Sequence, residues 1–107
     1  MSLSAADIAF ATDLFSDIPD LNTRRMFGGL GLYSGDQIFA VMRSDGQMLL
    51  KAKDDFAHSL EQMGAERWTH TRKNGVESSM PYWTLPEPAL EDPQMACDLA
   101  RQALKNL

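Results

Sequence analysis

The chain has 107 residues, a length that suits one compact domain spanning residues 1–107. Its net charge of −5 and its pI of about 4.8 argue against sequence-independent binding to duplex DNA, so direct DNA binding is not expected. The sequence has one cysteine, no signal-peptide pattern and no apolar run long enough for a membrane span, which predicts a cytoplasmic protein.

The first predicted element is a helix that begins after Ser4. Ser4 with Asp7 three positions later is typical of an N-cap with an acid at the N3 position. Pro19 and Asp20 end the helix. Between these signals, apolar residues recur at helical spacing: Ile8, Ala11, Leu14, Phe15 and Ile18.

Three short strands are predicted next, over Met26–Tyr33, Gln37–Met42 and Gln47–Lys53. Turn signals separate them at Gly35-Asp36 and at Ser44–Gly46. The second strand is an uninterrupted apolar block, which favours a central strand, although its period alone does not exclude a helix. The three segments together predict an antiparallel meander.

Glycines are concentrated in the first of these strands, at Gly28, Gly29 and Gly31, directly after Arg24 and Arg25. A phosphate loop needs a Lys followed by Ser or Thr, and a dinucleotide fingerprint needs glycines that open a helix. Neither pattern is present, so we predict that Gly28 and Gly29 form a bulge or sharp bend that another backbone approaches closely. The two arginines point to opposite faces of a strand, where one can be solvated and the other held by a carboxylate, or can contact an anion or partner.

A second helix and a hairpin follow. Asp54 or Asp55 is the expected N-cap of the helix, and Gly64 suits the left-handed position after its end. The hairpin has strands at Arg67–Arg72 and Val76–Thr84.

Two residues of this hairpin have specific consequences. The Asn74-Gly75 pair predicts a tight turn. Pro81, inside the returning strand, predicts an edge position or a bulge.

The last helix is expected after a proline-rich connection, Leu85–Pro93. Asp92 is its predicted N-cap with Pro93 at N1, and Cys97 is expected to be a packing residue beside the apolar stripe. The stripe itself consists of Ala96, Leu99, Ala100, Ala103 and Leu104. The whole order predicts an α+β domain, α-β(3)-α-β(2)-α, with a mainly antiparallel five-stranded sheet flanked by helices.

Several motifs of the chain resemble a known family. They are "TRRMFGGLGLY" at Thr23–Tyr33, then "IFAVM" and "LLKA", and later "WTHTRKNGVESSMPYWTLPEPALEDPQMACDLARQAL". From Thr23 to Leu104 the sequence is similar to the N-terminal domain of the TfoX/Sxy competence regulators. The resemblance implies the same element order, a regulatory role in DNA uptake, and a protein partner such as the cAMP receptor protein. Two-domain members continue into a helix-hairpin-helix-like domain that has no counterpart in this sequence, so a stand-alone domain is expected.

No catalytic constellation is evident in the sequence. His58 and His70 lie on different elements, and no ligand spacing for zinc is present, so neither a metal nor a cofactor is expected. We therefore predict a non-enzymatic protein-interaction module. The candidate contacts for a partner or an anion are Arg24, Arg25, Gly28, Gly29, Arg72 and Trp83.

The alternative is a small-molecule-binding protein or enzyme with a pocket beside Gly28-Gly29 and Trp83. Tyr82 and Trp83 are adjacent in a strand and point to opposite faces, so that one of them is core and the other is available for contact. Sheet edges and a surplus of aromatic and methionine residues also predict a weak homodimer.

Overall fold

The computed structural model describes residues 3–26, 28–71, 74–75 and 77–107. Within these residues, one six-stranded antiparallel sheet has the strand order β1-β2-β3-β4-β6-β5. The elements are α1 (Ala5–Leu14), β1 (Leu21–Met26), β2 (Gly29–Ser34), β3 (Gln37–Met42), β4 (Met48–Lys51), α2 (Asp54–Gln62), β5 (Arg67–Thr71), β6 (Glu77–Thr84), η1 (Glu87–Glu91) and α3 (Pro93–Lys105). The α+β class is confirmed, but the prediction of five strands is wrong.

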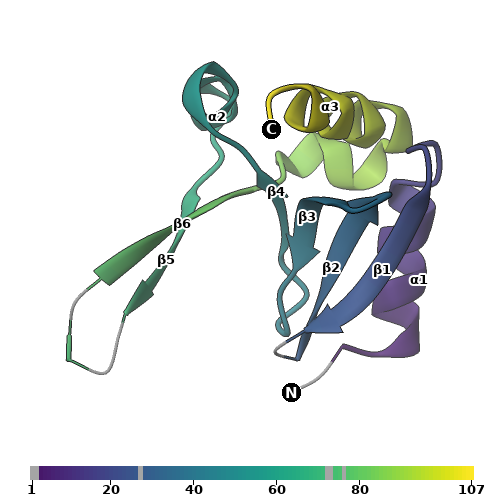
Figure 1. Cartoon of the computed structure of the whole chain (residues 1–107), viewed down its shortest axis with the longest axis horizontal. Helices are drawn as coiled ribbons and strands as arrows, with labels where there is room; N and C mark the ends of the chain where they lie inside the picture. The colour runs from purple at the N-terminus through teal and green to yellow at the C-terminus, as the bar shows by residue number, and fades with distance from the viewer. Residues whose placement is uncertain (1–2, 27, 72–73, 76) are drawn as a thin grey trace.

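The main core lies between one face of the sheet and the helices α1 and α3. Leu32, Ala40 and Leu50 line this face on three neighbouring strands and are fully buried. Phe15, just after α1, meets Phe39 of β3 edge to face, with 5.4 Å between the ring centroids. Figure 1 shows α1 and α3 beside β1 to β4, whereas β5 and β6 extend away from them as a two-stranded arm.

The helix α1 begins as predicted and ends earlier than predicted. Ser4 is its N-cap: the Asp7 amide donates to the Ser4 hydroxyl at 3.2 Å, and the Ser4 amide donates to the Asp7 carboxylate at 3.0 Å. The helix stops at Leu14 instead of continuing to Ile18. Ile18 is still buried, because the turns after the helix carry it into the same core.

The glycine-rich segment is a hairpin and not a single strand. Met26 of β1 pairs with Gly29 of β2, so the chain reverses direction between these two residues. Gly28, in that turn, has a φ of 79°, which confirms the predicted bend. The sequence pattern missed β1 because this strand lies at the edge of the sheet and alternates half-buried with exposed residues.

The other turns of the first four strands agree with the sequence. A two-residue turn containing Gly35 (φ 60°) joins β2 to β3. Between β3 and β4, the Gly46 amide donates to the Arg43 carbonyl at 2.8 Å, which confirms a tight turn. In the β5–β6 hairpin, Gly75 has a φ of 84°, as a turn there requires, but residues 72–73 and 76 lie outside the described part of the chain.

The N-terminus of α2 differs from the prediction. Lys53 is the N-cap and makes no side-chain cap hydrogen bond, so neither Asp54 nor Asp55 caps the helix. Both acids lie in the first turn, where a negative charge is favourable next to the helix dipole. At the other end, Gly64 has a φ of 91°, and the Ala65 amide donates to the Leu60 carbonyl, which confirms the predicted left-handed terminus.

The helix α3 follows the sequence prediction closely. Asp92 is its N-cap, accepting a hydrogen bond from the Met95 amide at 3.2 Å, and Pro93 opens the first turn. Cys97 is buried, and its thiol donates to the Leu14 carbonyl at 3.4 Å, which confirms its packing role. The preceding connection is more ordered than predicted, because Glu87–Glu91 forms the 3₁₀ helix η1.

Pro81 lies in an irregular part of β6, which is not an edge strand. β6 pairs with β4 on one side and with β5 on the other. Opposite the Arg67–Thr69 step of β5, the register shifts and β6 has extra residues, among them Pro81. The predicted bulge is therefore confirmed, and the alternative of an edge position is wrong. Only Tyr82, Trp83 and Thr84 of β6 pair with β4, so the rest of the hairpin leaves the sheet as the arm.

Candidate functional site

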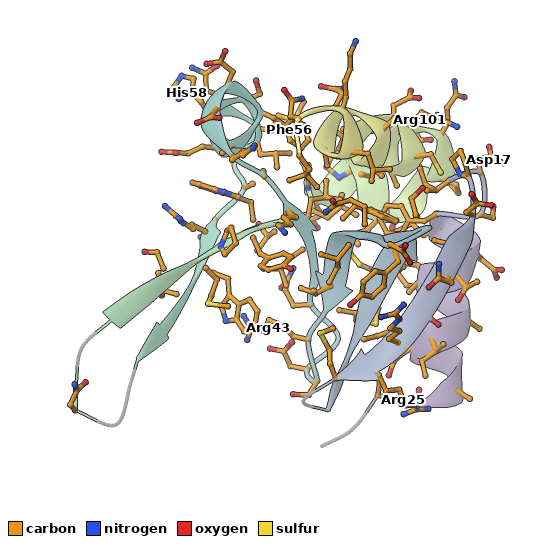
Figure 2. The ribbon with its side chains drawn as sticks, viewed as in Figure 1. Asp17, Arg25, Arg43, Phe56, His58 and Arg101 are labelled. Carbon is orange, nitrogen blue, oxygen red and sulfur yellow. The ribbon has the colours of Figure 1, made fainter. Side chains whose placement is uncertain are left out.

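A groove lies between the arm and the neighbouring ends of β1, β2 and β3. Its cavity volume is about 290 Å³. Figure 2 shows Arg43 in this region, directed toward the arm. The groove is lined by Met26, Gly29, Leu30, Val41, Met42, Arg43, Ser44, Trp68, Met80 and Tyr82.

The groove opens on the face of the sheet opposite α1 and α3, and we call this the open face. Gly31, Val41 and Leu49 are paired across β2, β3 and β4 and share this face. Val41 and Leu49 are buried, although they do not belong to the core cluster on the helix side. Apolar side chains therefore form the floor of the open face.

Two tyrosines, Tyr33 and Tyr82, also lie on the open face. Tyr82 shares the open face with Lys51, its partner on β4, and Tyr33 lies on the same face on β2. Burial raises the pKa of the Tyr82 phenol above its ordinary value of 10.0, and the Tyr33 hydroxyl raises it further.

Arg43 links the β3–β4 turn to the arm. Its guanidinium pairs with the Asp45 carboxylate at 2.6 Å and lies over the Trp68 ring, 5.7 Å from the centroid. The Trp68 ring in turn lies 6.3 Å from the Tyr82 ring. These contacts hold the base of the arm against the open face.

Glycine at position 29 lets two strands approach each other at the edge of the groove. A Cβ at Gly29 would lie 2.5 Å from the Met42 carbonyl oxygen, closer than any side chain is tolerated. The close backbone approach predicted for the two glycines is therefore confirmed at Gly29, and the left-handed conformation at Gly28.

Trp83 does not line the groove. It belongs to the core on the helix side, with 9% of its surface exposed, and the Arg67 guanidinium lies 5.6 Å from its ring centroid. Arg67 also donates to the Met80 carbonyl at 3.0 Å. The sequence correctly indicated opposite faces for Tyr82 and Trp83, but Tyr82 is the one beside the pocket.

The remaining candidate residues are dispersed. Arg24 is exposed on the open face with its guanidinium 4.8 Å from the Tyr33 ring centroid, so an aromatic ring, and not a carboxylate, is its partner. Arg25 is exposed near the end of β1, away from Arg43 (Figure 2). Arg72 lies outside the described residues.

Sequence patterns missed the residues that make the groove, above all Arg43, Trp68 and Met80. Each looked ordinary in its own segment: a turn arginine, a strand tryptophan and a strand methionine. They come together because the register shift around Pro81 bends the arm, and local periodicity does not encode that bend.

Charge is unevenly distributed between the sheet and the helices. The described strands β1 to β4 contain Arg24, Arg25 and Lys51 and no Asp or Glu. The helical segments contain many of the acidic residues: Asp7 and Asp13 in α1, Asp54, Asp55 and Glu61 in α2, Glu87 and Glu91 in η1, and Asp98 in α3. Arg24 and Lys51 lie on the open face, whereas Arg25 pairs with Leu30 and lies on the opposite face. The charged side chains that β1 to β4 place on the open face are thus both cations.

Three further features of the described part of the chain concern metal-binding groups, histidine contacts and membrane-spanning helices. No group of three or more His, Cys, Asp or Glu residues there is arranged to hold a metal ion. His58 forms a hydrogen bond with Gln62 at 3.0 Å on the exposed side of α2. Within the same residues, no helix combines the length and apolar character that crossing a membrane requires.

Comparison with known proteins identifies relatives of the chain. The family model described as the TfoX N-terminal domain matches residues 13–107. The chain is also 27% identical over 85 residues to a protein of Aliivibrio fischeri named DNA transformation protein TfoX1. That alignment covers 79% of this chain and 40% of the relative, so the chain spans less than half of the relative's length.

Proposed function

Because the chain belongs to the TfoX N-terminal domain family, we propose that it is a non-enzymatic regulatory module that acts in DNA transformation by binding another protein. The link to transformation is supported by the name of the Aliivibrio fischeri relative. A transcription regulator is the class of partner that we propose.

The groove beside the arm is the observation that carries this proposal. Met26, Trp68, Met80 and Tyr82 surround it, with Arg43 at its rim. Aromatic residues, methionine and arginine are the types enriched at protein interfaces, and Trp, Tyr and Arg are enriched among the residues that dominate binding energy. The cations of the open face beside the groove add a surface that selects partners by charge.

The test is genetic complementation in the host organism. Deletion of the gene is expected to lower the frequency of DNA transformation, and the wild-type gene restores it. Met80→Glu introduces a charge into the groove and is expected not to restore it. Met63→Glu is the matched control, because Met63 is 52% exposed at the end of α2, away from the groove.

Two outcomes would contradict the proposed function. One is normal transformation in the deletion strain. The other is full complementation by Met80→Glu, provided that the variant accumulates to the wild-type level.

The second candidate function is binding of a small molecule in the same groove. Its volume of about 290 Å³ lies just below the range for ligand pockets, roughly 300–1,000 Å³. A thermal-shift screen against classes of metabolites distinguishes the two functions. A strong stabilisation by one class that Met80→Glu abolishes would favour the small-molecule function.

A further inference from the structure

Within the described part of the chain, the rim of the groove has one cationic side chain available to a ligand, that of Arg43. Arg43 keeps 37% of its side-chain surface exposed, and among the described residues Asp45 is the one hydrogen-bonding partner of its guanidinium. Since an arginine has several N–H donors, Arg43 retains donors for a second carboxylate. Arg24 and Lys51 lie on the same open face.

The interior of the groove is apolar and small. Met26, Val41 and Met80 supply flexible or aliphatic surface, and Trp68 and Tyr82 supply aromatic surface. A volume of about 290 Å³ accommodates a few side chains and not a folded domain. The ligand that fits is a short segment with one or two large apolar side chains.

From these observations, and resting on the proposed protein-binding function, we propose that the groove binds an acidic segment of a partner protein. A large apolar residue of that segment occupies the space between Met80 and Val41. Carboxylates on either side of this anchor contact Arg43 and the other cations of the open face. The chemistry selects against basic segments, because Arg43 at the rim and Arg24 and Lys51 on the open face are all cations.

Single-stranded nucleic acid is an alternative anionic ligand for the groove. It binds by stacking bases on free aromatic faces along a basic groove. Here Arg43 lies over the Trp68 ring and Arg24 over the Tyr33 ring, so the two rings already have cations on one face. Methionine and valine side chains, which favour an aliphatic or aromatic side chain over a base, form much of the remaining lining.

A second copy of the chain is the remaining occupant to weigh. Phe10 is 44% exposed on α1, three residues from Asp7 and from Asp13. These three residues of α1 combine a large apolar side chain with two carboxylates, as the proposed acidic segment does. A head-to-tail contact between α1 of one copy and the groove of another joins two different surfaces and generates a ring or an open filament, not the weak homodimer that the sequence predicts. We therefore place a partner protein in the groove, and self-association is measured in parallel.

The experiment measures the fluorescence anisotropy of labelled peptides of roughly ten residues, the length of an extended or helical recognition segment. The acidic probes carry one Phe, Trp, Leu or Met anchor among Asp and Glu residues. Matched probes replace the acids with Asn and Gln, or the anchor with Ser. A single-stranded oligothymidylate is the nucleic-acid probe.

Arg43→Gln and Met80→Glu separate the two parts of the site. Arg43→Gln is expected to weaken an acidic probe by about fivefold or more and the matched amide probe by less than about twofold, since the lost charge attracts only the acidic probe. The amide probe reports any change in groove shape that follows from the loss of the Arg43 contacts with Asp45 and Trp68. Met80→Glu is expected to abolish binding of both probes, and Met63→Glu to leave both unchanged. Circular dichroism confirms that each variant is folded.

Several results would overturn the proposal. They are no binding of any acidic probe, equal binding of acidic and amide probes, tighter binding of the oligothymidylate, or self-association that both Met80→Glu and Phe10→Ser abolish. If either of the first two results is found while Met80→Glu still fails to restore transformation, the protein-binding function stands and the acidic ligand is wrong. If the deletion strain transforms normally, the proposed function itself fails.

Discussion

Gly28 and Gly29 are adjacent, yet each is required for a different physical reason. Gly28 has a φ of 79°, a backbone conformation that L-residues adopt at a cost. Gly29 has no room for a side chain, because a Cβ would lie 2.5 Å from the Met42 carbonyl oxygen. The first requirement concerns local backbone conformation, and the second concerns the approach of β3.

The two glycines therefore respond differently to substitution. Gly28→Asn is expected to destabilise the fold less than Gly28→Ala, which costs about 1 kcal/mol, because Asn tolerates the left-handed conformation. Gly29→Ala is expected to cost about 1–3 kcal/mol, since the backbone of β3 must move. Urea unfolding measures all three variants. A Gly29→Ala variant as stable as the wild type would contradict the close approach.

Tyr82 predicts a loss of stability at alkaline pH. Its pKa in the folded protein is raised above 10.0 by burial and by Tyr33, so the folded state holds the phenol proton more tightly than the unfolded state does. The contribution of Tyr82 to stability is then complete below about pH 10 and is lost as the pH rises through the folded-state pKa.

Comparison with Tyr82→Phe isolates this contribution. The free energy of unfolding of the wild type is expected to fall more steeply above about pH 10 than that of the variant. Below that pH, the difference between the two proteins is expected to be constant. Parallel curves at alkaline pH would show that Tyr82 titrates identically in both states.

At the scale of elements, the helices differ in how they begin. The first turn of α3 has a side-chain cap from Asp92, whereas that of α2 has none. We expect Asp92→Ala to destabilise the protein by about 1 kcal/mol, because the Met95 amide loses its acceptor. Asp55→Ala is the control, since Asp55 is an exposed acid in a first turn without a capping role. Thermal unfolding checks both, and an equal loss in the two variants would contradict a specific capping contribution.

The β5–β6 arm depends on its base. Its last residues pair with β4, and Arg67 fastens the register shift by donating to the Met80 carbonyl beside the Trp83 ring. Arg43, in the β3–β4 turn, also contacts the base of the arm, because its guanidinium lies over the Trp68 ring of β5. The base of the arm is thus also a wall of the groove, and its packing sets the shape of the binding site.

At the scale of the whole molecule, the exposed edge of β1 predicts weak self-association. β1 pairs with β2 on one side only, and its unpaired backbone groups can meet those of another copy. Sedimentation over a hundredfold concentration range starting near micromolar is expected to show a weak dimer. Met80→Glu is expected to leave this dimer intact, because Met80 lies on β6 and not on the unpaired edge of β1. A monomer at every concentration would rule the dimer out.

Much of the fold is determined locally by the sequence. Ser4 with Asp7, and Asp92 with Pro93, place the starts of two helices through hydrogen bonds within a single turn. Gly35, Gly46 and Gly64 mark turns and a helix end, because their backbone conformations are left-handed. The strand β1 was missed because an edge strand needs little apolar pattern of its own and is stabilised by its pairing with β2.

The groove was decided by the tertiary structure. Gly29 was predicted to allow a close approach, but only the folded chain shows that Met42 is the neighbour. Trp68, Met80 and Arg43 come from segments far apart in the sequence, and the register shift around Pro81 brings them together. Strand alternation indicated that Tyr82 and Trp83 face opposite ways, whereas the choice between them required knowing which face α1 and α3 cover. Local hydrogen bonding is encoded within a few residues, while the packing of one face against another depends on the whole chain.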